Sequence, residues 1–174
     1  MNRHGDARKM ASGRTHARVA KIVFVTSTIS AVGITYAAGV KLDSYALATL
    51  TGLSLGFYAG IYITPDLDVD NGNISYATMR KKGGWLGGKL WAFFWRSYAR
   101  RQPHRGVSHT FIRGTASRWS YIFWRGAWPF ILGLCAYLWF ADALHILPIV
   151  ATFFLAAFIA MSLQDLGHIV FDQF

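Results

Sequence analysis

The sequence predicts an all-α, polytopic membrane protein with about four transmembrane helices and a cytoplasmic interfacial helical segment. The chain of 174 residues is 53% hydrophobic and only 15% charged, whereas soluble domains carry about 25% charged residues. Its apolar residues are gathered into long stretches, which favours a bilayer over a soluble core. We therefore expect a single membrane domain over residues 1–174.

Two uncharged stretches predict a helical hairpin over residues 22–64. Residues 22–40 and 45–64 contain no Asp, Glu, Lys or Arg, and each would be about 30 Å long as a helix, enough to cross the hydrocarbon core. The four residues that join them favour an antiparallel pair. Small residues recur at every fourth position of the second stretch, either as a stripe for close helix packing or by chance. They are Gly52, Gly56 and Gly60.

A second helical pair is predicted over residues 127–174. The third apolar stretch, residues 127–140, is followed by a short polar connection. The fourth begins at Pro148, a residue suited to the first turn of a helix, and it is uncharged up to Gln164. Both stretches are less uniform than the first two, but their hydrophobicity brings the number of expected spans to four.

A basic and aromatic segment, residues 65–126, separates the two pairs. Within it, residues 85–98 are rich in Trp and Phe, which predicts an interfacial helix with aromatic rings at headgroup depth and basic groups near lipid phosphates. A lid over a site is an alternative for the same residues. A surface that binds single-stranded nucleic acid is a third, but the flanking membrane stretches already account for the aromatic residues.

The charge distribution predicts the orientation in the membrane. The chain has 18 Lys and Arg against 8 acidic residues, with six of the basic residues in residues 1–21, eleven in 65–126 and one, Lys41, between the first two stretches. Basic residues concentrate on the cytoplasmic side of a membrane. We therefore expect a multi-pass protein of the inner membrane, with a basic cytoplasmic N-terminus (1–21) and both termini in the cytoplasm.

Four separate segments deliver histidine and aspartate to this cytoplasmic face. The set comprises His16, Asp66, Asp68, His104, His109, Asp165, His168 and Asp172. Imidazole and carboxylate groups without thiolates favour Zn, with Mn, Fe or Ni as alternatives, and they argue against a Cys-rich structural site. Each motif alone is equally explained by a polar turn, a solvated loop or a helix end. Their convergence on one face predicts a metal site.

Three motifs resemble those of a known group of proteins. Pro-Asp-Leu-Asp begins at residue 65, His-Arg-Gly-Val-Ser-His-Thr at residue 104 and Gly-His-Ile-Val-Phe-Asp at residue 167. Together they resemble the LexA-regulated, YdjM-like, membrane-bound metal-dependent hydrolases and a related family of uncharacterised metal-binding membrane proteins. The start of the latter family is similar to Ser-Gly-Arg-Thr-His at residue 12, so the resemblance extends from there to the end of the chain.

The resemblance implies a helical membrane fold with a metal centre. It also implies basic groups beside the motifs at Arg14 and Arg105, which we expect to bind phosphate oxygens of a substrate. Seven ligands are more than one tetrahedral ion needs, so two ions are expected. The ligand roles fall on His16, Asp66, Asp68, His104, His109, His168 and Asp172.

The functional hypothesis is a metal-dependent hydrolase at the cytoplasmic membrane face. A lipid-linked phosphate or another phosphoester is the expected substrate, and Asp68 or Asp165 is the expected general base. A non-catalytic metal-binding membrane protein, with a structural metal or a sensor or carrier role, is an alternative. A membrane-tethered binder of anionic lipid or nucleic acid is another, and its binding would depend on salt rather than on chelators.

Overall fold

The computed structural model describes residues 13–68, 74–102 and 106–171, and all side chains in these ranges except those of residues 13–17, 74 and 171. Within them the fold is all-α, as predicted, and no strand occurs. Short 3₁₀ and π turns connect the α-helices. The helices are α1 (Gly13–Ala37), α2 (Ser44–Gly60), α3 (Ile74–Ala99), α4 (Arg113–Ile122), α5 (Trp128–Phe140) and α6 (Leu147–Phe171).

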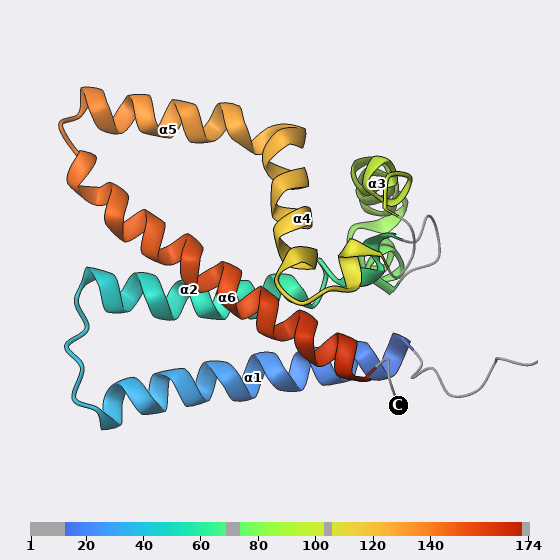
Figure 1. The fold of residues 1–174 in the computed structure, drawn as a ribbon, viewed down its shortest axis with the longest axis horizontal. Coiled ribbons are helices and arrows are strands. Elements are labelled where there is room, and N and C mark those ends of the chain that lie inside the picture. Colours follow the sequence, from blue (N-terminus) through green and yellow to red (C-terminus); the bar gives the residue numbers. More distant parts are fainter. Residues whose placement is uncertain (1–12, 69–73, 103–105, 172–174) are drawn as a thin grey trace, which may run out of the picture.

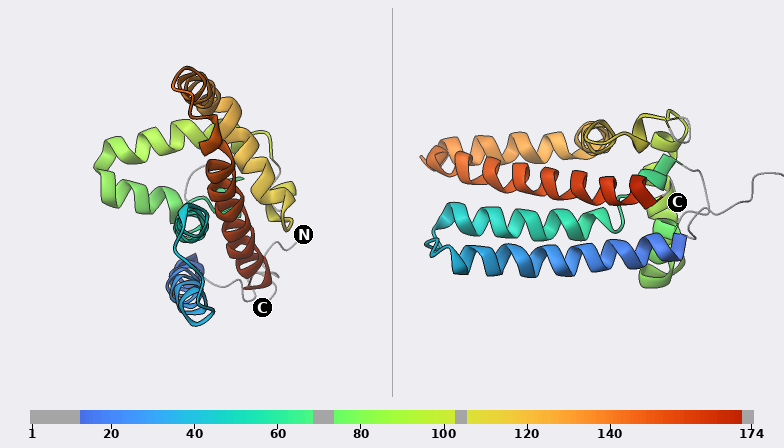
Figure 2. Two further views of the ribbon diagram at one scale, coloured as in Figure 1. Left: turned by 90° about the vertical axis from the view of Figure 1, so that its left-hand side faces the viewer. Right: turned by 60° about the horizontal axis from the view of Figure 1, so that its bottom comes forward.

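Four helices run along the length of the molecule and two lie at one end of it. The α1–α2 and α5–α6 connections lie together at one end, and α5 diverges from α6 as it leaves that end (Figure 1). At the opposite end α4 and α3 run across the long axis, and α3 spreads sideways over the ends of the longer helices (Figure 2). The described start of α1 therefore lies at the same end of the molecule as the basic helices α3 and α4.

The glycine stripe of α2 faces α6 at close range. A Cβ atom added to Gly56 would lie 2.3 Å from the carbonyl oxygen of Ala157, and one added to Gly52 would lie 2.3 Å from the carbonyl oxygen of Phe153. Ala157 and Ala160 on the facing side of α6 are buried. The stripe therefore serves close helix packing, as its spacing indicated, and chance is no longer needed to explain it.

Substituting Gly56 with alanine is expected to destabilise the fold by about 1–3 kcal/mol, because the new methyl group would meet backbone atoms that cannot move aside. Gly33→Ala on α1 is the matched control, since a Cβ there meets nothing within 4 Å and alanine favours helix by about 1 kcal/mol. Thermal unfolding in detergent would compare the two variants. Equal melting temperatures for both would contradict the close α2–α6 contact.

Helix α3 is bent into two arms at Gly84. This residue has φ +63°, a left-handed conformation that glycine adopts without steric cost. The bend separates a first arm, residues 74–83, from a second arm, residues 84–99. Figure 2 shows the two arms as a V whose tip lies away from the bundle.

The second arm of α3 contains the predicted interfacial helix, but only part of its aromatic surface is exposed. Trp95 and Tyr98 are buried together with Leu67, and the Trp95 ring stacks on Tyr121 of α4 with centroids 5.4 Å apart. On this face Trp95 and Tyr98 therefore contact protein, and the headgroup depth of the exposed aromatic residues stays a prediction. The buried rings form a core that fixes residue 67 and its neighbours against α3 and α4.

Two helices in the described part of the chain are long and apolar enough to cross a membrane. They are Arg18–Ala37, within α1, and Leu144–Val170, which contains most of α6. With 17 residues in α2 and 13 in α5, the other two predicted spans are shorter than the roughly 20 residues of a straight transmembrane helix. Length and composition therefore make Arg18–Ala37 and Leu144–Val170 candidates for crossing a membrane.

Candidate metal centre

Three separate elements bring acidic and imidazole groups together at the end of the molecule that carries α3. The chain leaves α2 and turns at Pro65 into η1 (Pro65–Asp68), a short 3₁₀ turn that presents Asp66. A second turn, η2 (Val107–His109), presents His109 just before α4. His168 lies in the last turn of α6. Because α6 packs closely on α2, its last turn lies beside the turn that follows α2.

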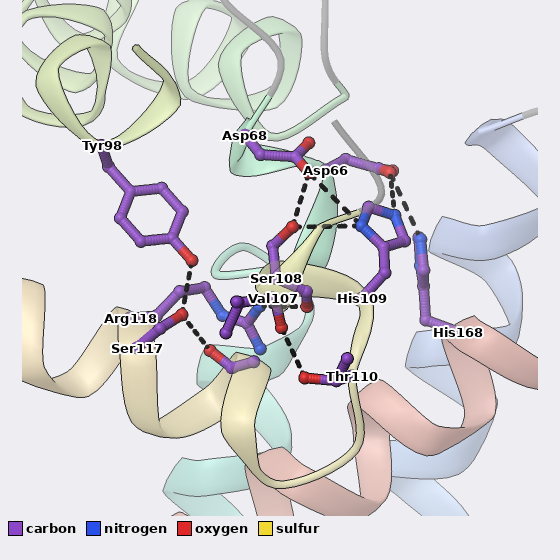
Figure 3. A network of polar contacts seen from close by, with 11 residues as sticks. Asp66, Asp68, Tyr98, Val107, Ser108, His109, Thr110, Ser117, Arg118 and His168 are labelled. Atoms are coloured by element: carbon purple, nitrogen blue, oxygen red, sulfur yellow. Dashed lines mark hydrogen bonds and ion pairs between the residues drawn. The ribbon is translucent and has the colours of Figure 1, made fainter. Parts of the chain in front are cut away.

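The geometry of these three side chains fits one metal ion. Figure 3 shows Asp66 reaching toward both imidazole rings: its Oδ1 lies 3.6 Å from His109 Nε2 and 3.4 Å from His168 Nε2. One ligand atom from each residue lies within 4.8 Å of the others. These separations exceed the roughly 2.7–3.2 Å of a good N–H···O hydrogen bond. The two distances from Asp66 Oδ1 lie close to the edge of about 3.3–3.4 Å in a zinc tetrahedron with bonds of about 2.0–2.1 Å.

Asp68 orients the imidazole of His109 from behind. Its Oδ2 lies 3.3 Å from His109 Nδ1 and accepts a hydrogen bond of 2.5 Å from Ser108 Oγ. A carboxylate on one ring nitrogen fixes the tautomer and leaves the other nitrogen for a metal. The side chain of Asp68 is fully buried, whereas that of Asp66 is 32% exposed. The described contacts therefore place Asp66 at the open side of the site and Asp68 behind it.

Electrostatics in the site favour ionised carboxylate beside protonated imidazole. Burial alone would lower the pKa of His109, but the carboxylates of Asp66 and Asp68 outweigh it and raise that pKa to about 9. Burial would also raise the pKa of Asp66, yet the imidazoles of His109 and His168 hold it well below its usual range. Asp66 is therefore ionised at every physiological pH, and His109 carries a proton that a metal ion must displace.

Metal affinity is expected to rise with pH and to level off above about 9, the pKa of His109. Below that pKa, binding requires loss of the imidazole proton, so the apparent affinity should increase about tenfold per pH unit. Titration with Zn²⁺ against a competing chelator at pH 7, 8 and 9 measures this slope, and calorimetry in two buffers counts the released proton. An affinity that stays constant from pH 7 to pH 9 would contradict the assignment of His109 as a ligand.

A buried ion pair supports the site from α4 and α6. Arg118 and Asp165, whose side chains are 0% and 1% exposed, form an ion pair between these helices. Thr115 donates a hydrogen bond to the same carboxylate. Arg118 Nη1 also donates to the carbonyl oxygen of Ser108, at 3.2 Å. The network runs from α6 through Arg118 to the turn that carries Ser108 and His109, and Figure 3 shows Arg118 beneath that turn.

The structure brings together four of the residues expected to bind metal. Asp66, His109 and His168 form the donor set, and Asp68 contacts His109. The other expected residues lie outside the described side chains, and their roles stay predictions. They are the ligands His16, His104 and Asp172 and the substrate-binding residues Arg14 and Arg105.

Asp165 shares its helix with His168, but it does not join the three donors. Its Oδ2 is held by Arg118 and Thr115 in a buried position, one helical turn before His168. Arg118 and Thr115, three residues apart on α4, are components that the sequence reasoning missed. Their spacing places them on one helix face, but nothing in the sequence shows which acidic residue that face meets.

The fold and this donor set define a class: a small helical protein with a histidine–aspartate metal centre built from three chain segments. The chain belongs to a family described as uncharacterized metal-binding proteins, DUF2227, whose model matches residues 11–174. No curated protein and no solved structure matches it. The match supports the metal-binding part of the resemblance found in the sequence.

Proposed function

We propose that this protein binds a divalent transition metal, with Zn favoured and Mn, Fe or Ni as alternatives, and acts as a metal-dependent hydrolase of phosphoesters. The observation that carries the proposal is the approach of Asp66 Oδ1 to His109 Nε2 and His168 Nε2, at 3.6 and 3.4 Å, with one ligand atom of each residue within 4.8 Å of the others. Three protein ligands around such an ion leave a fourth position for a substrate or water, as in catalytic zinc sites. The 32% exposure of the Asp66 side chain supports access from solvent.

The proposal includes a four-span arrangement in the inner membrane. Helices α1, α2, α5 and α6 all expose large apolar side chains, among them Ile34, Tyr58, Phe130 and Leu155. Soluble monomers rarely expose apolar surface on this scale. Tilting and flanking aromatic residues allow a short helix such as α5 to cross a locally thinned bilayer. The basic end of the bundle, both termini and the metal centre then face the cytoplasm.

The residues of the site are suited to phosphoester hydrolysis. Bound at this centre, a divalent ion would polarise a phosphoryl oxygen and lower the pKa of a water molecule. Asp66, His109 and His168 would hold the ion, and Asp68 would keep the His109 ring in place. Arg14 and Arg105 remain the proposed phosphate-binding residues. Asp68 is the proposed general base, and Asp165 is set aside for that role because Arg118 and Thr115 hold its buried carboxylate away from the three donors. Second-ion ligands would have to come from His16, His104 and Asp172.

A lipid-linked phosphate is the proposed substrate because the centre lies where the apolar helices end. Its acyl chains would remain among α1, α2, α5 and α6 while its headgroup reaches Asp66. The test uses protein reconstituted in bilayers with Zn²⁺ or Mn²⁺, and it follows release of inorganic phosphate from lipid phosphomonoesters and release of the alcohol from lipid phosphodiesters. His168→Ala should abolish release, and His145→Ala, an exposed histidine at the opposite end of the bundle, should not. Release that is the same in both variants would contradict the proposal.

A structural metal is the second candidate function. The three donors come from η1, η2 and α6, so an ion would connect segments far apart in the sequence. His109 and His168 have side chains only 10% and 9% exposed, which is typical of a closed site. A metal-dependent melting temperature without hydrolysis of any phosphoester would favour this candidate over the enzyme.

A further inference from the structure

The outer face of the second arm of α3 carries an exposed stripe of apolar and basic side chains. It follows the helical repeat, and its residues are Trp85, Leu86, Lys89, Leu90, Phe93 and Arg96. Phe93 is 70% exposed and Trp85 is 65% exposed. The opposite face of the same helix is already packed, through Trp95 and Tyr98, against η1 and α4. The arm is therefore apolar on two faces, and the described part of the chain covers only one of them.

Basic groups lie directly over the aromatic rings of this outer stripe. Lys89 Nζ is 3.8 Å from the centroid of the Trp85 ring, and Arg125 Cζ is 5.5 Å from that of Phe93. Such cation–π contacts keep a positive charge next to apolar side chains. The charge stays at the exterior of the protein. The combination of apolar side chains and cations is typical of helices that lie in the headgroup region of a membrane.

The contact between Arg125 and Phe93 places the outer stripe beside the start of α5, which gives its position along the long axis of the bundle. Arg125 belongs to a π turn, η3 (Phe123–Ala127), which leads directly into α5. The neighbouring Trp124 and Trp128 are 72% and 43% exposed, and Trp at the start of a membrane helix lies at headgroup depth. The outer stripe thus lies at the level where α5 would enter the bilayer. Figure 2 shows α3 lying across the bundle at this end.

We propose that the outer stripe of α3 docks on the anionic phospholipids of the membrane that the bundle spans. Leu86, Leu90 and Phe93 enter the boundary between headgroups and acyl chains, while Lys89 pairs with lipid phosphates. The proposal rests on the four-span arrangement but not on hydrolysis. It gives α3 a role beyond supporting η1: the helix holds the metal centre at a set height above the lipid phosphates.

A fluorescent probe on the outer stripe tests this docking. Cys135 is the only cysteine of the chain, so Cys135→Ser allows single labelling with an environment-sensitive dye at Leu90→Cys. A second variant labelled at Leu132→Cys reports on α5, where Leu132 is 60% exposed. The full-length proteins are reconstituted, one copy per nanodisc, in phosphatidylcholine with or without phosphatidylglycerol. Brominated acyl chains serve as the quencher.

The probe at residue 90 should emit at shorter wavelength and be quenched when phosphatidylglycerol is present. Lys89→Gln should lower the ratio of inserted to free helix roughly fivefold, since one basic charge contributes about 1 kcal/mol near an anionic surface. Quenching at residue 132 but not at residue 90 would overturn the docking and retain the spans. A lack of quenching at both positions would overturn the spanning arrangement as well.

Two further outcomes would also overturn the proposal. A wavelength shift at residue 90 that occurs only in nanodiscs with two protein copies would show that a second copy covers the outer stripe. Equal quenching with and without phosphatidylglycerol, unchanged by Lys89→Gln, would show that lipid charge plays no part.

Discussion

Replacing Arg118 with methionine is expected to destabilise the protein by about 3–5 kcal/mol, because the substitution leaves the carboxylate of Asp165 buried without its cationic partner. The side chain of Asp165 is only 1% exposed, so water cannot take the place of the guanidinium. Arg118 also donates to the carbonyl oxygen of Ser108, and that bond is lost as well. Thermal unfolding in detergent, with and without Zn²⁺, measures the effect.

The double variant Arg118→Met, Asp165→Leu separates the cost of an unpaired charge from the value of the pair. Replacing both members of a buried ion pair with apolar residues is often neutral or stabilising, so this variant should recover most of the lost stability. If it melts as low as Arg118→Met alone, the carboxylate is not the cause of the destabilisation. If the double variant binds metal with the same affinity as the wild-type protein, the ion pair does not position the turn that carries His109.

Metal affinity is expected to fall most in His168→Ala, which removes one of three ligands. Asp68→Asn should weaken binding by roughly 10- to 100-fold, the usual effect of altering a group behind a ligand, and His168→Ala should weaken it further. His145→Ala is the control, since His145 lies in the connection between α5 and α6 at the opposite end of the bundle. Competition titrations with Zn²⁺ rank the three variants. Weaker binding in Asp68→Asn than in His168→Ala would reverse the assigned roles.

The long apolar helices were predictable from sequence because they depend on local pattern, whereas α4 was not predicted. Uncharged stretches of nearly 20 residues and short connections indicated the helical pairs. The four-residue spacing of Gly52, Gly56 and Gly60 allowed close packing, but it did not identify α6 as the partner. The aromatic residues of 85–98 were harder to place. Their pattern is apolar on two sides of the helix, and only the tertiary structure shows that Trp95 and Tyr98 pack inward while Phe93 does not.

Within the site, sequence patterns identified residue types but not their order in space. Asp66, Asp68, His109 and Asp165 are all plausible ligands by type and segment. Backbone direction in the two short turns decides which carboxylate faces both imidazoles and which lies behind one of them. The sequence shows Arg118 only as one of the eleven basic residues of 65–126. Its ion pair with Asp165 depends on how α4 and α6 are rotated about their own axes, which no local pattern specifies.

The most direct test of the metal centre is elemental analysis of the detergent-purified protein beside the double variant Asp66→Ala, His168→Ala. The three donors described here predict about one equivalent of transition metal per chain for a single site, lost in the double variant and kept in His145→Ala. A second equivalent would point to ligands among His16, His104 and Asp172. No bound metal after reconstitution with Zn, Mn, Fe or Ni, or equal metal in the double variant, would contradict the site.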